Sequence, residues 1–185
     1  WDTSNSNNWA RPATLNTELN TTYLNSLDST SKSMIGNTKY YLGGYNTSEI
    51  QKDVMYQYER KIQNTTSNEF FYGTNPNSWV GKLGLMYASD YGYAVSDECT
   101  QTLVNYDNAT CKNNNWLFKG IDEWLLTPNA SGGYGAFRVN SDGFVYSGDP
   151  QPGTQEGVRP VLYLISSAQI TGGNGTSSSP YTLGV

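Results

Sequence analysis

Two cysteines and a scatter of carboxylates are the residues of this chain whose types could support chemistry. The chain of 185 residues contains no histidine. A catalytic triad with an imidazole base and a histidine-based metal site are therefore both excluded. The glycine-rich loops that bind nucleotide phosphates are missing as well. We expect neither a cofactor nor a metal site.

Cys99 and Cys111 lie close together in the segment CTQTLVNYDNATC. In an oxidising compartment such a pair forms a disulfide, which stabilises a short loop by about 3 kcal/mol on the chain-entropy model. A zinc site would need further thiol or imidazole ligands, and the chain has none. A redox pair is the other alternative. We predict a disulfide between Cys99 and Cys111.

Paired carboxylates are the remaining route to an enzyme. A glycosidase needs two facing carboxylates at a set separation, and the spacing in this sequence singles out no pair. We therefore predict that the chain is not an enzyme, and we keep a carboxylate-based hydrolase as an alternative. The candidate carboxylates are Glu98, Asp122, Glu123, Asp142, Asp149 and Glu156.

Aromatic rings and acidic turns indicate recognition as another kind of function. Trp and Tyr offer rigid contact area, and Asn offers hydrogen bonds, which suits sugars or proteins. The same residues also pack the core of a small β-rich domain. Asp/Gly turns can bind a hard cation, although most are turns only. The possible binding residues are Trp116, Trp124, Tyr134, Asp142 and Asp149.

Arg159 stands between Val158 and Pro160, at the start of the apolar segment VRPVLYLI. The fork of an arginine can bind several carbonyls or a carboxylate at once. We interpret Arg159 as a structural clamp that binds loop carbonyls or an acid such as Asp142. Contact between Arg159 and a ligand is the alternative.

The composition limits the kinds of environment and of binding partner that suit this chain. Charged residues make up 15% of the chain and aromatic residues 14%, and Tyr, Asn, Ser, Thr and Gly are abundant. This composition is typical of an extracellular, β-rich surface protein. The net charge is −5 and no Lys/Arg cluster occurs, which argues against nucleic acid and anionic membrane surfaces as partners. No apolar run approaches the roughly 18 residues of a membrane span.

Two amphipathic helices are predicted in the first third of the chain. The first begins after a Thr14 cap and the second after a Ser48 cap. In each helix an apolar stripe recurs every four residues and is expected to face the core. The stripes are Leu15, Leu19, Tyr23 and Leu27 in the first helix, and Ile50, Val54, Tyr58 and Ile62 in the second.

Short strands are predicted for much of the remainder. Residues 135–148 form a β-hairpin that turns at Gly143. Residues 158–165 are apolar on both faces, so we expect a central strand there. The fold class is therefore α+β, a single domain in which N-terminal amphipathic helices precede a mainly antiparallel sheet of short strands.

Several motifs together resemble those of a known family. They are NNWARPATLNTELNTTYLNSL, WVGKLGLMYASDYGYA, EWLLTPNASGGYGAFRVNSDGFV and GVRPVLYL. Over nearly the whole chain this series resembles a large, mostly uncharacterised family of exported bacterial surface domains, found in prepilin-like proteins related to type IV pilins. More remotely, the W-L-x-x-P and G-V-R-P ending is similar to the C-type-lectin-like fold of the formylglycine-generating enzymes. Cys99 and Cys111 do not match the context of the reactive cysteines in those enzymes.

The resemblance implies an exported scaffold. We expect residues 1–185 to be one extracellular domain at the cell surface, with an anchoring helix before Trp1 and no membrane contact by this fragment. It would be the non-enzymatic head of a type IV pilin-like or related surface protein, acting in assembly or adhesion. The alternative is a carbohydrate- or protein-binding module of C-type-lectin-like fold. The expected partners are other pilin-like subunits, surface proteins or glycans, and not nucleic acid.

Overall fold

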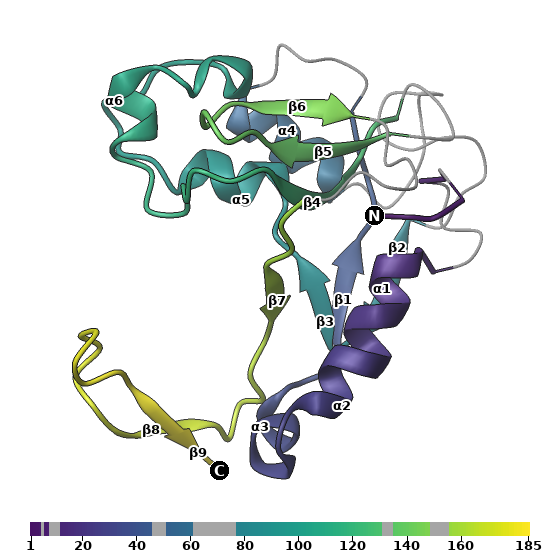
Figure 1. Ribbon diagram of the computed structural model, residues 1–185, viewed down its shortest axis with the longest axis vertical. Helices are drawn as coiled ribbons and strands as arrows, with labels where there is room; N and C mark the ends of the chain where they lie inside the picture. Colours follow the sequence, from purple (N-terminus) through teal and green to yellow (C-terminus); the bar gives the residue numbers. More distant parts are fainter. Residues whose placement is uncertain (5, 8–11, 46–50, 61–76, 131–134, 149–155) are drawn as a thin grey trace.

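The computed structural model shows a few helices and several short antiparallel sheets, which confirms the α+β class (Figure 1). Among the described residues the strands form four small sheets instead of one continuous sheet. Those residues include no helix that is both long and apolar enough to cross a bilayer. The structure describes residues 1–4, 6–7, 12–45, 51–60, 77–130, 135–148 and 156–185.

The elements are short. The helical segments are α1 Thr14–Glu18, η1 Leu19–Tyr23, α2 Leu24–Ser26, α3 Ser29–Met34, α4 Lys52–Glu59, α5 Ala88–Tyr93, η2 Leu103–Asn105 and α6 Ala109–Lys112. The strands are β1 Thr38–Tyr41, β2 Ser78–Gly81, β3 Leu83–Leu85, β4 Glu123–Pro128, β5 Ala136–Val139, β6 Val145–Gly148, β7 Pro160–Leu162, β8 Gln169–Gly172 and β9 Thr182–Gly184. The antiparallel sheets are β1–β2, β3–β7, β4–β5–β6 and β8–β9.

Strand β4 joins two hydrophobic cores. Its residues are all buried, and successive side chains of a strand point to opposite faces. Leu125 packs in a core with α4, α5 and the hairpin β5–β6, whereas Trp124 and Leu126 pack in a second core with η1, β1 and β3. Figure 1 shows these two groups of elements above and below β4. Strand β4 is thus the buried strand between the two cores, although in its own sheet it is an edge strand that pairs with β5.

The expectation of a central strand at residues 158–165 was wrong. Only Pro160–Leu162 form a strand, β7, and β7 pairs with β3 alone. None of residues 156–185 is buried. Apolar composition on both faces does not distinguish a central strand from one whose faces are left open.

The first predicted helix is present, although its cap differs. Residues 14–26 run through α1, η1 and α2 without a break, with a wider π turn in the middle. Thr14 is the first helical residue and not the cap, and Ala13 before it has no side chain that could cap. Asp2 provides the acceptor instead, since its Oδ1 accepts from the backbone N–H and the hydroxyl of Thr14, both at 3.0 Å. The helix start is therefore fixed by a residue distant in sequence.

The second predicted helix is α4, and it buries a different face from the one expected. Its buried side chains are Met55 and Glu59, while Val54 and Tyr58 are half-buried. Ser48, Ile50 and Ile62 lie outside the described residues. A search for a hydrophobic stripe does not find this buried face, because one of its two residues, Glu59, carries a carboxylate.

Close backbone approach explains the Gly-Gly after β1. A Cβ on Gly43 would lie 2.1 Å from the carbonyl oxygen of Tyr58, and one on Gly44 would lie 1.9 Å from that of Pro128. Only glycine lets the chain pass this close to the ends of α4 and β4. The predicted hairpin is confirmed as β5–β6, with Gly143 at φ 107° in its turn.

Glu59 lies fully buried between α4, α5 and β4. Its Oε1 accepts from the hydroxyl of Thr127 at 2.6 Å and from the backbone N–H of Ser89 at 3.2 Å, and its Oε2 accepts from the Ser89 hydroxyl. Arg60 donates to Oε2 at 2.8 Å. Burial disfavours the charged form and raises the pKa of Glu59 to about 7, against the lowering effect of these hydrogen bonds and of Arg60.

This raised pKa predicts a stability that falls as pH rises. Between the unfolded pKa of 4.5 and about 7, the folded state holds a proton that the unfolded state has lost. The Glu59 contribution is therefore largest below about pH 4.5, declines by about 3 kcal/mol between pH 4.5 and about 7, and is lost above that. In Glu59→Gln this decline should vanish from urea unfolding measured between pH 4.5 and 8. Glu98→Gln, at an exposed carboxylate, is the control. Equal pH profiles for Glu59→Gln and the wild type would contradict the assignment.

Candidate functional site

A cleft of about 380 Å³ lies between α5, the segment that follows α6, and β7. This size falls within the range of small-ligand sites. Two residues singled out from the sequence, Trp116 and Arg159, lie in its wall. The cleft is lined by Met86, Asp90, Tyr93, Ala94, Trp116, Leu117, Arg159 and Val161.

Trp116 presents its ring to solvent from a fixed backbone. Its side chain is 72% exposed, while its backbone N–H donates to the carbonyl of Ala94 at 3.2 Å. The preceding Asn115 is buried and donates to the carbonyl of Tyr91 at 2.9 Å, and its Oδ1 accepts from the Leu117 N–H at 3.0 Å. An exposed indole on a tethered backbone is a ready contact surface.

The disulfide between Cys99 and Cys111 is present, as predicted, with the two Cα atoms 4.8 Å apart. The loop that it closes sends Leu103 and Tyr106 into the core, and the Tyr106 hydroxyl donates to the Gly92 carbonyl at 3.0 Å. This loop returns the chain to the end of α5, where Trp116 follows. The disulfide therefore supports the wall of the cleft.

Asp90 contributes a carboxylate to the cleft wall. Its Oδ2 accepts from the backbone N–H of Tyr87 at 2.8 Å, which caps α5, and its Oδ1 accepts from Arg60 at 3.3 Å. The Arg60 guanidinium lies between the rings of Tyr56 and Tyr87, 4.2 and 4.1 Å from their centroids. Cation–π contacts on both sides hold the guanidinium in place, so the orientation of Asp90 depends on the Glu59–Arg60 network.

Arg159 binds Glu123. Its Nε donates to Oε1 at 3.1 Å and its Nη2 donates to Oε2, a bidentate pair. The Glu123 side chain is buried and Arg159 is partly exposed to the cleft. The predicted partner Asp142 was wrong: Asp142 lies in the exposed turn between β5 and β6, where its N–H donates to Asn140.

Backbone bonds beside this pair fix the approach to β7. The Trp124 N–H donates to the carbonyl of Gly157 at 3.0 Å, and the Gly157 N–H donates to the carbonyl of Asp122 at 2.6 Å. Arg159 stands two residues further along the chain. The bidentate pair between Arg159 and Glu123 and these backbone hydrogen bonds together hold residues 157–159 against the start of β4.

The other predicted binding residues do not join the cleft. Trp124 is 2% exposed and packs in the core, so its ring is not available to a ligand and that expectation was wrong. Sequence periodicity cannot separate a core tryptophan from a surface one when the whole strand is buried. Tyr134 and Asp149 lie outside the described residues.

The candidate hydrolase carboxylates are also placed elsewhere. None of the five that are described lines the cleft. Glu123 and Glu156 form ion pairs with Arg159 and Arg138, and Asp122 accepts from Asn140 at 3.1 Å. Within the described part of the chain, no cluster of three or more acidic, cysteine or histidine residues could hold a metal ion.

Sequence reasoning missed the two other polar residues of the cleft. Tyr93 is half-exposed in its wall, and Asp90 is indicated by the sequence only as a helix cap. Tyr91 and Tyr93 differ by two positions on a short helix, so one is buried and the other faces the cleft. The sequence offers no signal for which of the two is exposed.

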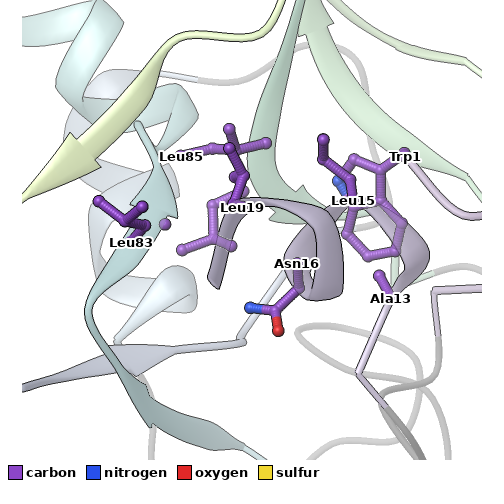
Figure 2. Close-up of a pocket in the computed structure, with 9 residues that line it drawn as sticks. Trp1, Ala13, Leu15, Asn16, Leu19, Leu83 and Leu85 are labelled. Atoms are coloured by element: carbon purple, nitrogen blue, oxygen red, sulfur yellow. The ribbon is translucent and has the colours of Figure 1, made fainter. Parts of the chain in front are cut away.

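A second cavity lies between the first helix and β3 and has a volume of only about 20 Å³. Figure 2 shows Leu19 near Leu83 and Leu85, with Trp1 and Leu15 beside it and the Asn16 amide pointing away from these leucines. Leu19, Leu83 and Leu85 belong to the hydrophobic core. A space of this size and polarity holds at most one water, so it is a packing defect of the core and not a ligand site.

Comparison with known proteins identifies no relative: no family model matches the chain, and neither a curated protein nor a solved structure is similar enough to count as a match.

Removing the disulfide is predicted to destabilise the domain. The double variant Cys99→Ser/Cys111→Ser should lower the free energy of unfolding by about 3 kcal/mol in urea titrations, because the open loop gains conformational entropy when unfolded. Thr100→Ser, an exposed change in the same loop, should leave it within about 0.5 kcal/mol, as is usual for surface substitutions. Identical unfolding midpoints for the wild type and the double variant would show that the disulfide does not constrain this region.

Proposed function

We propose that this chain is a non-enzymatic extracellular domain, the head of a type IV pilin-like or related bacterial surface protein, whose cleft binds carbohydrate in adhesion. The observation that carries the proposal is the exposed ring of Trp116 in a cleft that also contains Asp90 and Tyr93. Tryptophan is enriched among the residues that dominate binding surfaces, so an exposed ring in the wall of a cleft favours a contact role.

The cleft combines the two kinds of contact that a sugar needs. The Trp116 and Tyr93 rings offer flat apolar faces, and Met86, Ala94, Leu117 and Val161 add further apolar surface. Asp90 accepts hydrogen bonds, the Tyr93 hydroxyl can donate or accept, and Arg159 donates. A pyranose presents apolar C–H patches beside hydroxyl groups, so it matches this mixture.

The carboxylates favour binding over hydrolysis. Asp90 is the single carboxylate among the described lining residues. The neighbouring Glu123 is buried and held by both donors of the Arg159 fork. A glycosidase uses two carboxylates that flank the scissile bond, and this cleft provides one, whose oxygens already accept from Tyr87 and Arg60.

Three features support an extracellular location. A closed disulfide is typical of oxidising compartments. The low charge and the abundance of Tyr, Asn, Ser and Thr are typical of surface proteins. The family resemblance adds display on the bacterial surface. A module of C-type-lectin-like fold that binds a protein in the same cleft is the alternative, and the absence of glycan binding in the test below would favour it.

The proposal predicts a carbohydrate ligand that depends on Trp116. The chain should bind a subset of glycans on an array, tested with and without calcium, and Trp116→Ala should weaken that binding at least tenfold, a loss of about 1.4 kcal/mol. Removing a central aromatic anchor commonly costs that much or more. Tyr23→Ala, an exposed aromatic on the first helix, is the matched control and should bind as the wild type does. No glycan bound under either condition, or equal weakening by both variants, would contradict the proposal.

A further inference from the structure

The C-terminal strip, residues 158–185, exposes many large hydrophobic side chains. More than half of the large hydrophobic side chains that are exposed in the described structure lie in it. They are Val158, Leu162, Tyr163, Leu164, Ile170, Tyr181, Leu183 and Val185. A single domain rarely exposes so many neighbouring apolar residues unless they form an interaction surface.

The end of this strip is a hairpin that forms a sheet of its own among the described residues. Strands β8 and β9 pair with each other and with no other described strand, and Figure 1 shows the hairpin standing apart from the rest of the chain. An isolated two-stranded hairpin is marginally stable in water. An ordered hairpin in this position indicates that a further surface covers it.

The hairpin has one apolar face. Ile170 lies directly opposite Leu183 in the register, so their side chains point to the same side. Ile170 is 61% exposed, and Val185 follows Leu183 on that side by alternation. The opposite face is polar, since the hydroxyls of Thr171 and Thr182 lie 3.3 Å apart there. This pattern is that of a sheet with one face meant for burial.

Charge indicates what covers the apolar face. Residues 160–185 contain no charged side chain, so the whole net charge of −5 belongs to residues 1–159. A charged partner would find no opposite charge in this segment, and an anionic lipid surface would find no lysine or arginine. Each copy carries a net charge of −5, so two copies meet with less repulsion through a surface that has no charged side chain.

We propose that the apolar face of the β8–β9 hairpin docks on the same face of a second copy of this chain, related by a twofold axis. In such an isologous contact each residue meets its own counterpart or a near neighbour, so any charge in the patch would face its like. The uncharged segment meets this requirement. The closed dimer buries Ile170 and Leu183 of both copies and leaves the Trp116 cleft outside the contact.

Sedimentation equilibrium of the purified chain, from micromolar to millimolar concentration, tests this proposal. The mass should rise with concentration and level off at twice that of one chain. Ile170→Glu places like charges on both sides of the axis and should raise the dissociation constant at least tenfold. Thr171→Glu, on the next residue but on the polar face, should change it less than twofold.

Three results would overturn the proposal. They are a monomer at every concentration, a mass that grows beyond the dimer, and equal effects of the two variants. Ile170→Glu is expected to fold, because β8 contributes no side chain to either hydrophobic core, and thermal unfolding at low concentration checks this. Glycan binding is independent of this test, since the cleft and the hairpin share no residue.

Discussion

The buried carboxylate of Glu123 is the constraint on which the cleft depends. A carboxylate in a desolvated position costs several kcal/mol unless a cation and hydrogen bonds compensate it. Arg159 provides the cation and the hydrogen bonds through its bidentate guanidinium. The segment that contains Arg159 is also joined to the start of β4 by the backbone hydrogen bonds of Gly157. Because residues 157–159 lead directly into β7, the same pair sets where β7 meets β3 and where the cleft ends.

The same principle recurs in the rest of the fold. Glu59 is compensated by Arg60, and Glu156 by Arg138, whose guanidinium also lies over the rings of Trp124 and Tyr146. Arg60 also forms an ion pair with Asp90. The Asp90 carboxylate in the cleft is therefore held in place by residues that belong to the core. The opposite wall depends on the disulfide loop and on Asn115, which place Trp116 beside the end of α5. The site is therefore preorganised by groups that do not contact a ligand.

The sequence predicts features whose determinants are local. The hairpin at residues 135–148 follows from alternation and a turn glycine, the first helix from its four-residue stripe, and the disulfide from two cysteines with no other role. It does not predict features that depend on distant partners. The cap of α1 comes from Asp2, the buried face of α4 includes a glutamate, and the clamp of Arg159 closes on Glu123 instead of Asp142. The apolar segment at residues 158–165 has the composition of a central strand, but the fully buried strand between the two cores is β4.

A double-mutant cycle between Arg159 and Glu123 tests most directly whether this pair holds the cleft wall. Free energies of unfolding in urea would be compared for Arg159→Ala, Glu123→Gln and the combined variant. We predict a loss of about 3 kcal/mol for Arg159→Ala, because it leaves a buried carboxylate unpaired. The combined variant should recover part of that loss, with a coupling of about 2 kcal/mol. Effects that add within about 0.5 kcal/mol would contradict the account, because they would show that the two side chains act independently.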